Sequence, residues 1–592
     1  MRFSSSHSRI AALVFASAIG MAAPALAETA EPEPIEAGRS LAGNYLAARI
    51  ATTDRDTAAA VEFYRKAIAL DPDNTNLKLQ GFLNFVANGD FAEGVELGQE
   101  ISKAGEAPEI VRLILSVDAV RKKSWGQADR FLDNEWRSPV DRLIAGLSKG
   151  WIEFGRGNTE KALEQVDGLS GPGWFNFFVE YHGGLIAMAD GDIPAAVGRL
   201  EKATANPAGR QFARRTHKRS TAALAQVHAR NNNENAARAI LSAALRDYPQ
   251  DPLYTSMLQA LTDGQPLWSD IKSAQRGAGE VFLNLGMAVD REGGEQFALI
   301  YLQLARVLSG ENDDIALKLA ELLDKQGRLR EANALFSAIE PSSYNYRIAR
   351  LEYALNLDEL EQEEEARKEL DALVESGPDD LVTHLSYGAV MARHEKYDEA
   401  IEIYKTFIDN LDQAERVHWN LFYRLGIAYE RTKQWPLAEA AFKRALELEP
   451  DQPSVLNYLG YSWIDMNMNL QEGLDMIRKA VSLRPNDGYM VDSLGWAYYR
   501  LGRIPEAVKE LERAVELRPG DPTINDHLGD AYWLAKRKLE ATFQWQHALA
   551  QDPPDGTDVR IREKLKVGLD KVLEREKAEK LAEEQEKKEK DG

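Results

Sequence analysis

The chain has 592 residues, 44% of them hydrophobic and 28% charged, with a formal net charge of −22 and no cysteine. The negative charge disfavours nucleic acid and anionic lipid surfaces as partners. The lack of cysteine excludes disulfides, a thiolate nucleophile and cysteine-ligated zinc.

The first 27 residues resemble a secretory signal peptide. Arg2 and Arg9 precede an apolar run over residues 10–23, and Ala25-Leu26-Ala27 forms a small-residue cleavage site. We expect cleavage after Ala27 and a periplasmic protein, with extracellular release as the alternative. A retained anchor is disfavoured because the apolar run is short, and no later segment suggests an integral membrane span. Lipid attachment would need a cysteine, so the sequence predicts no lipoprotein.

Residues 28–36 form an acidic, proline-containing linker, and a helical pattern repeats through residues 37–250. A residue that we call the anchor recurs at intervals of mostly 34 residues, and a small residue follows each anchor twelve positions later, or thirteen positions later in one unit. The pairs in this N-terminal array are Ala48/Ala60, Phe82/Gly94, Ser116/Ala128, Gly150/Ala162, Gly184/Ala196 and Ala225/Ala237. The helical period supports these degenerate units.

The pattern is irregular over residues 251–279. Anchors 225 and 286 are separated by less than two periods, and the interval contains Asp263-Gly264-Gln265-Pro266 and Gly277-Ala278-Gly279. Both clusters are typical of helix-breaking turns. Two interpretations stay open: a hinge between two arrays, or a shortened repeat that does not move.

The pattern is clearest in a C-terminal array over residues 280–555. Its pairs are Gly286/Ala298, Ala320/Ala332, Ala354/Ala366, Gly388/Ala400, Gly426/Ala438, Gly460/Gly473, Gly495/Ala507 and Gly529/Ala541. In the last four units an aromatic residue follows the anchor by three positions, and a proline closes each unit. Residues 556–592 then predict a capping helix, with Leu565, Leu569 and Val572 on one stripe, and a charged tail.

The spacing Leu-Gly-x2-aromatic, then Ala, a bulky residue and Pro, resembles the tetratricopeptide repeat. The resemblance implies an all-α solenoid of about fourteen helical hairpins in a right-handed superhelix, with first helices lining a concave groove. Small residues let the two helices approach closely, and stacking buries the apolar face that one hairpin leaves exposed. Proline ends each second helix because it lacks an N–H group.

The resemblance also implies which residues face the groove: those three before each anchor and one, four and five after it. In the last units we select as the protein-binding groove Asn457, Tyr461, Asp465, Asp492, Trp496, Tyr499, Arg500, Asp526, Asp530 and Trp533. Rigid aromatics beside acids suit an extended or helical peptide. For Trp496 and Trp533, packing between repeats remains the alternative. The Lys/Asn/Arg carboxylate clamp of chaperone-binding members is missing.

A basic cluster at Arg214, Arg215, Lys218 and Arg219 interrupts the acidic composition. Arg214/Lys218 and Arg215/Arg219 are i, i+4 neighbours on a helix and share a face. A solvated helix that neutralises acidic neighbours is one interpretation. A contact for an acidic partner or for cell-wall material is the other.

No catalytic, cofactor or metal motif is present. The sequence lacks H-E-x-x-H, a phosphate-binding loop, G-x-S-x-G and a dinucleotide fingerprint, and its nine histidines are scattered. We therefore expect a protein that is not an enzyme and needs no cofactor.

Residues 457–549, with NYLGYSWID and INDHLGDAYW, resemble a group of bacterial envelope tetratricopeptide proteins. That group includes a lipoprotein adaptor that binds a carboxyl-terminal processing protease and delivers cell-wall hydrolases to it. The resemblance implies a scaffold or adaptor that binds a periplasmic protease, although membrane tethering is not carried over. The alternatives are a scaffold for exopolysaccharide export or outer-membrane assembly, and a cell-wall glycan binder.

Overall fold

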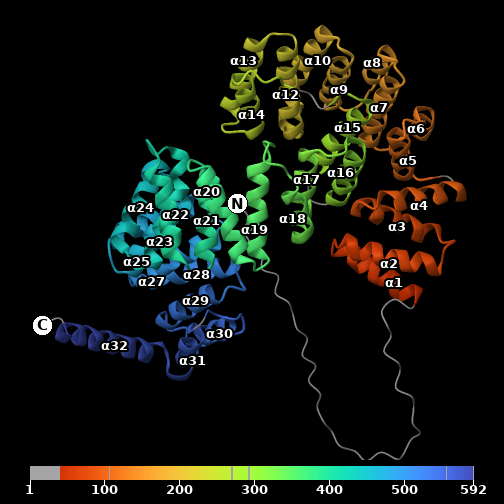
Figure 1. Ribbon diagram of the computed structural model, residues 1–592. Coiled ribbons are helices and arrows are strands. Elements are labelled where there is room, and N and C mark those ends of the chain that lie inside the picture. Colours follow the sequence, from red (N-terminus) through yellow and green to blue (C-terminus); the bar gives the residue numbers. More distant parts are fainter. Residues whose placement is uncertain (1–39, 106, 268–270, 291–293, 555, 591–592) are drawn as a thin grey trace, which may run out of the picture. The chain divides into compact units, whose positions relative to one another are not determined.

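The computed structural model describes residues 40–105, 107–267, 271–290, 294–554 and 556–590, and within them it contains only helices (Figure 1). The predicted signal peptide and acidic linker therefore lie outside the described residues. No helix in the described part of the chain is long and apolar enough to cross a bilayer. The chain divides into two compact units between Lys318 and Leu319, within helix α17.

Unit 1 begins with six helical hairpins and ends with a seventh. The six hairpins are α1–α2 (Leu41–Thr53, Thr57–Leu70), α3–α4 (Thr75–Asn88, Phe91–Ala104), α5–α6 (Glu109–Arg121, Trp125–Leu132), α7–α8 (Pro139–Gly155, Thr159–Asp167), α9–α10 (Phe175–Asp190, Ile193–Ala205) and α12–α13 (Arg214–Arg230, Glu234–Asp247). The short α11 (Pro207–Phe212) and the single α14 (Pro252–Thr262) precede the hairpin α15–α16 (Ala274–Val289, Glu295–Ser309).

Unit 2 continues the alternation of helices. It begins at Leu319 within α17 (Asp313–Lys325), whose first residues belong to unit 1, and α17 pairs with α18 (Leu329–Ser337). The following hairpins are α19–α20 (Tyr346–Glu359, Glu363–Ser376), α21–α22 (Leu381–Arg393, Tyr397–Asp409), α23–α24 (Trp419–Arg431, Trp435–Leu448), α25–α26 (Pro453–Asp465, Leu470–Leu483), α27–α28 (Gly488–Arg500, Ile504–Leu517) and α29–α30 (Pro522–Leu534, Lys538–Leu549), and the last helices are α31 (Thr557–Val567) and α32 (Leu569–Lys590). A 3₁₀ turn (Arg416–His418) precedes α23.

Every predicted anchor lies on a first helix and every paired small residue on the following second helix, and all are buried. The predicted all-α array of about fourteen hairpins is therefore confirmed. Glycine anchors leave room for the second helix. A Cβ at Gly388, Gly426 or Gly529 would come within 2.7 Å of the ring of Tyr404, Phe442 or Trp545, respectively. At Gly460 the neighbour is the backbone itself, because a Cβ there would lie 2.8 Å from the Gly473 carbonyl oxygen.

The turn between the two helices of each hairpin has a fixed geometry. The residue seven positions after the anchor has a positive φ, between 56° and 95°, in every hairpin where that residue is described. Glycine is favoured in this region because it has no Cβ. The residues at this position are Arg55, Gly89, Lys123, Gly157, Gly191, Asn232, Gly327, Glu361, Glu395, Lys433, Asn467, Gly502 and Lys536.

The irregular segment 251–279 lies inside unit 1. Helix α14 is capped by Asp251 and ends at Thr262, and Gly264 follows with φ +68°, as the turn prediction requires. The prediction that Gly277-Ala278-Gly279 breaks a helix is wrong, because all three residues lie within α15. The glycines serve close packing instead: a Cβ on Gly277 would sit 2.2 Å from the ring of Trp151. The hinge stays a prediction.

The hairpin α15–α16 packs against the first helices of the preceding hairpins. Helix α15 contacts α5, α7, α9 and α12, and α16 contacts α3 and α5. Trp151 and Tyr181 both contact α15. Trp151 follows its anchor by one position and Tyr181 precedes its anchor by three positions, so both occupy positions that the repeat assigns to the groove. The chain's own hairpin therefore covers the first-helix face of unit 1.

Candidate protein-interaction surface

Three polar contacts join the successive first helices α25, α27 and α29 of unit 2. The side-chain amide of Asn457 donates to Ser493 Oγ at 3.2 Å, and Arg500 Nη1 donates to Asp465 Oδ1 at 2.9 Å. His527 Nδ1 lies 3.0 Å from Asp492 Oδ1. All ten predicted groove residues lie on these three helices, and the contacts involve four of them, Asn457, Asp465, Asp492 and Arg500.

An aromatic stack lies across α27 and α29. The ring of Trp496 is stacked between Tyr499, at a centroid distance of 4.7 Å, and His527, at 4.0 Å. Their planes differ by only 12° and 18°, so the three rings form a layered platform. We call Tyr499, Trp496 and His527 the aromatic platform.

Side chains next to the platform are open to solvent. The side chain of Asp465 is 56% exposed and that of Arg500 is 29% exposed. Tyr461 is half-buried, and burial raises the pKa of its hydroxyl, with the charges of Asp465 and Asp492 adding to the rise. We call Asn457, Tyr461, Asp465, Trp496, Tyr499 and Arg500 the α25–α27 face. It offers aromatic area together with a donor and an acceptor of opposite charge.

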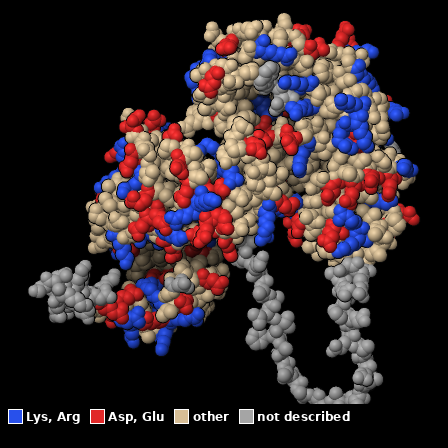
Figure 2. All heavy atoms as spheres, viewed as in Figure 1, with Lys and Arg blue, Asp and Glu red and all other residues tan. Residues whose placement is uncertain are grey.

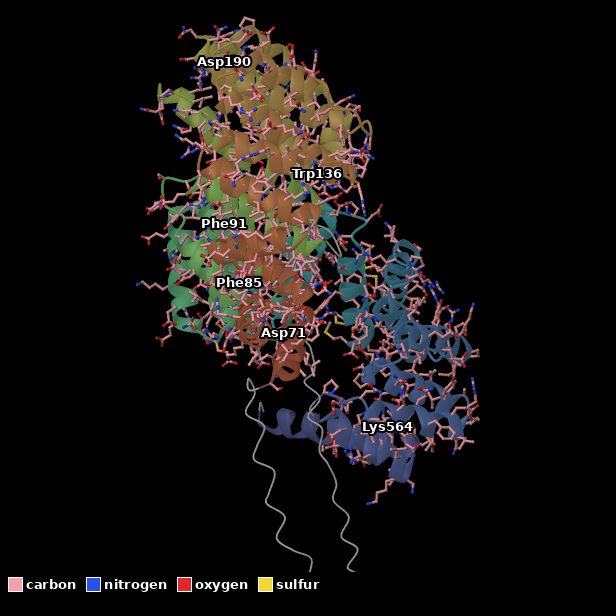
Figure 3. All side chains as sticks on the ribbon, turned by 90° about the vertical axis from the view of Figure 1, so that its right-hand side faces the viewer. Asp71, Phe85, Phe91, Trp136, Asp190 and Lys564 are labelled. Carbon is pink, nitrogen blue, oxygen red and sulfur yellow. The ribbon has the colours of Figure 1, made fainter. Side chains whose placement is uncertain are left out.

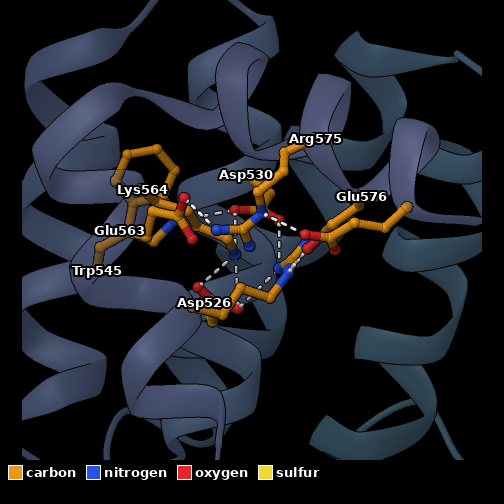
Figure 4. Close-up of polar contacts among 9 residues, drawn as sticks. Asp526, Asp530, Trp545, Glu563, Lys564, Arg575 and Glu576 are labelled. Carbon is orange, nitrogen blue, oxygen red and sulfur yellow. Dashed lines mark hydrogen bonds and ion pairs between the residues drawn. The ribbon is translucent and has the colours of Figure 1, made fainter.

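The last repeat has a different environment, shown in Figure 4. Lys564 of α31 is fully buried, and its Nζ lies 2.8 Å from Asp526 Oδ1 and 2.7 Å from Asp530 Oδ1. Trp545 Nε1 donates to Asp530 Oδ1 at 3.0 Å. Arg560 contacts Asp530 at 3.5 Å and Glu576 at 2.8 Å. Burial raises the pKa of Asp530, whereas the charge of Lys564 opposes the rise.

Trp533 is also held within the chain. Its indole N–H donates to Asp570 at 2.9 Å, its ring packs on Trp545 and it leaves no room for a Cβ on Gly568. Leu569 and Val572 of α32 are fully buried beside this contact, at the end of unit 2 where Figure 3 labels Lys564. Asp526, Asp530 and Trp533 therefore have intramolecular partners, and they are not included in the α25–α27 face.

The basic cluster of unit 1 is largely used inside the unit. Arg219 forms ion pairs with Glu280 and Asp314, and Lys218 pairs with Asp251. Arg214 and Lys218 both lie over the ring of Tyr248, at 5.3 and 4.8 Å. Arg214 and Lys218 thus share a face, as predicted, but their common partner is the half-buried Tyr248 of the same unit. On the face shown in Figure 2, basic and acidic side chains are interspersed within each unit.

The sequence did not predict that Glu280 pairs with Arg219, or that Lys564 pairs with Asp526 and Asp530. Glu280 lies 4% exposed within α15, where it accepts hydrogen bonds from Tyr181 at 2.9 Å and from Arg219. For Glu280 a signal existed, because residues 278–289 and 298–308 are apolar apart from Glu280, Asn284, Gln303 and Arg306, and apolar residues on most sides of a helix are typical of a buried helix. In the described residues no group of three or more His, Asp or Glu side chains is placed to hold a metal ion.

Comparison with known proteins identifies the repeat. Family models described as TPR repeat or tetratricopeptide repeat match residues 42–74, 419–452 and 495–535. The chain is a tetratricopeptide repeat (TPR) protein. TPR arrays are protein-interaction scaffolds, and the matches fall in both units.

Two curated relatives and two solved structures illustrate the similarity. The TPR repeat-containing protein PA4667 of Pseudomonas aeruginosa is 31% identical over 137 residues, 20% of this chain and 23% of the relative. The tetratricopeptide repeat-containing protein trd-1 of Caenorhabditis elegans is 28% identical over 153 residues, 26% of this chain and 18% of the relative. This TPR chain thus spans less than a quarter of the length of these relatives.

The solved structures are similar at lower identity. The Cut9–Hcn1 hetero-tetramer of the APC/C is 15% identical, covers 90% of this chain and 97% of the matched chain, and has a TM-score of 0.37. MamA from AMB-1 is 22% identical, covers 28% of this chain and 97% of its own, and has a TM-score of 0.25.

Proposed function

We propose that the chain is a scaffold or adaptor that binds a segment of a protein partner on the α25–α27 face. The observation that carries this proposal is the contrast between the units. In unit 1 the chain's own hairpin covers the first-helix face, whereas the equivalent positions on α25 and α27 combine half-buried aromatics with an exposed ion pair.

Tyrosine, tryptophan and arginine are enriched among the residues that supply most of the binding energy at protein interfaces, and the two aromatics bury a large area at a low cost in conformational entropy. Tyr461, Trp496, Tyr499 and Arg500 place three aromatics and one arginine on two adjacent helices. An extended or helical peptide could lie across such a face and use Asp465 and Arg500 for orientation.

The finer role that we propose is an adaptor that holds a processing protease together with its envelope substrates. Its support is the resemblance of residues 457–549 to the envelope adaptor group, and these residues contain the whole α25–α27 face. The periplasmic location rests on the sequence of residues 1–27, which lie outside the described residues.

Affinity purification from periplasmic extract tests the proposal. The wild-type chain is compared with Trp496→Ala/Tyr499→Ala, and captured proteins are identified by mass spectrometry. The matched control is Leu539→Ala/Phe543→Ala on α30. It also removes two large side chains, and these residues are 67% and 59% exposed and lie outside the α25–α27 face.

We expect a protease or cell-wall hydrolase to be captured by the wild type and the control, and lost by the Trp496/Tyr499 variant. Equal capture by all three baits, with the helical content unchanged, would refute the assignment of the face. Capture of export or assembly proteins would replace the protease adaptor with an assembly scaffold. Retention on purified cell wall instead would favour the glycan-binding alternative.

A further inference from the structure

His527 is the one member of the aromatic platform that changes charge near neutral pH. It lies on α29 with its ring 4.0 Å from Trp496, and its Nδ1 lies 3.0 and 3.1 Å from the two oxygens of Asp492. The side chains of His527 and Asp492 are only 12% and 11% exposed. A charge on this ring is therefore weakly screened by water.

Carboxylates outnumber cations around His527. Asp492 faces it from α27, and Asp526 and Asp530 stand on its own helix. From α31, Lys564 and Arg560 neutralise Asp526 and Asp530, while Glu576 of α32 pairs with Arg560. On the other side, Asp465 of α25 is paired with Arg500 of α27, and the hydroxyls of Tyr461 and Tyr499 stay neutral. A protonated His527 supplies a missing positive charge.

The pKa of His527 agrees with this charge balance. Burial alone would lower it, but Asp492, and then Asp526 and Asp530, raise the pKa above the ordinary value of 6.5. An imidazolium against the indole also gains a cation–π interaction that the neutral ring lacks. Protonation therefore strengthens both contacts that His527 makes across the α27–α29 boundary.

We propose that His527 makes partner binding at the α25–α27 face dependent on pH: its imidazolium holds Trp496, and through it Tyr499, in the stacked arrangement, and loss of the proton loosens the platform. This inference rests on the proposed function for its binding consequence. The stack itself is a property of the chain and can be tested without a partner.

The first test is ¹⁹F NMR of the full chain labelled with 5-fluorotryptophan. The Trp496 signal is assigned by its loss in Trp496→Phe, and its shift is followed from pH 5.5 to pH 9. We expect one transition with a midpoint above pH 6.5, and its loss in His527→Gln. Because burial also raises the pKa of Asp530, Asp530→Asn serves as the control, which should retain the transition at a lower midpoint because the charge of Asp530 raises the pKa of His527. No transition, or one that survives in His527→Gln, would overturn the proposal.

The second test uses the proteins that the immobilised wild-type chain captures from extract at pH 6. When the beads are transferred to buffer at pH 8.5, the amount of captured protein that stays bound should fall about fivefold, as expected when a charge-assisted contact becomes a neutral one. Retention on His527→Gln should not change with pH. If the NMR transition is present but no bait captures a partner, the proposed function fails and the platform transition stands. If retention on both baits has the same pH dependence, the coupling to His527 is refuted.

Discussion

Arg219 of α12 forms a two-point ion pair with Glu280 of α15, with Nε 2.8 Å from Oε1 and Nη2 2.7 Å from Oε2. The two residues are 61 positions apart, and Tyr181 of α9 donates to the same carboxylate at 2.9 Å. This contact fixes the hairpin α15–α16 against the first helices of unit 1. Arg219, a member of the predicted basic cluster, therefore has a role inside unit 1.

Replacing Arg219 by methionine should therefore destabilise unit 1. The change leaves Glu280 buried without its cation, which costs about 3–5 kcal/mol for a buried pair. Arg214→Met, on an exposed side chain of the same helix, should cost less than about 1 kcal/mol. Urea unfolding of the two variants measures the difference, and equal losses would contradict the assigned role of the pair.

Gly460→Ala should lower the stability of unit 2, because the new Cβ would meet the Gly473 carbonyl oxygen at 2.8 Å. The two helices must then separate, at a cost of about 1–3 kcal/mol typical of overpacking. Gly198→Ala in α10 is the matched control, since a Cβ there meets nothing within 4 Å. It should instead raise stability by about 0.5–1 kcal/mol through helix propensity. Thermal unfolding of both variants separates the two effects.

The hairpin turns allow a test of backbone conformation alone. Gly502 has φ +73° and no atom within 4 Å of a Cβ, so Gly502→Ala should cost about 1 kcal/mol through φ only. Lys536 occupies the same turn position with φ 66°, and Lys536→Gly should be neutral or stabilising. Opposite results in denaturant titrations would show that the left-handed turn is not retained in solution.

Unit 1 should lose stability in mild acid because of His182. Trp151 Nε1 donates to its Nδ1 at 3.2 Å, so the neutral ring carries its proton on Nε2. Burial lowers the pKa of His182 from 6.5 to about 3. The unfolded chain therefore takes up a proton below pH 6.5 that the folded chain does not.

The contribution of His182 is fully present above pH 6.5 and is lost progressively as the pH falls towards 3, by about 1.4 kcal/mol per pH unit. Urea unfolding between pH 7 and pH 5 measures this slope. His182→Gln should lower stability at pH 7 and flatten the slope by about one proton. An unchanged slope in the variant would show that His182 is not the group responsible.

The sequence predicted the hairpins well because each one depends on local spacing. The anchor and its small partner, twelve positions later in all units but one, both lie within one hairpin, and the same pair recurs from Ala48 to Ala541. Contacts between distant residues were not predictable in this way. Nothing in a 34-residue period indicates that α15 would lie against α7 and α9, or that Lys564 would neutralise Asp526.

For the site, the repeat register placed the candidate residues on adjacent first helices but could not tell which of them already have partners. Asp465, Trp496 and Arg500 stay on the α25–α27 face, whereas Asp530 and Trp533 contact residues of α31 and of the segment that follows it. Helices α31 and α32 make these contacts, and their residues depart from the repeat pattern. Glu563 lies 34 positions after the anchor Gly529, and Arg575 lies twelve positions after Glu563. These two residues form an ion pair, whereas the anchor and its partner in most earlier hairpins are small residues that pack together.

Site-specific photo-crosslinking is the most direct test of the claim that a partner binds on the α25–α27 face. A photoreactive phenylalanine analogue is placed at Tyr461, or at Phe543 on α30 as the control, and the full chain is irradiated in periplasmic extract. A discrete protein adduct from Tyr461 and none from Phe543 is the predicted result. Adducts from Phe543 alone, with none from Tyr461 in a folded chain, would contradict the account.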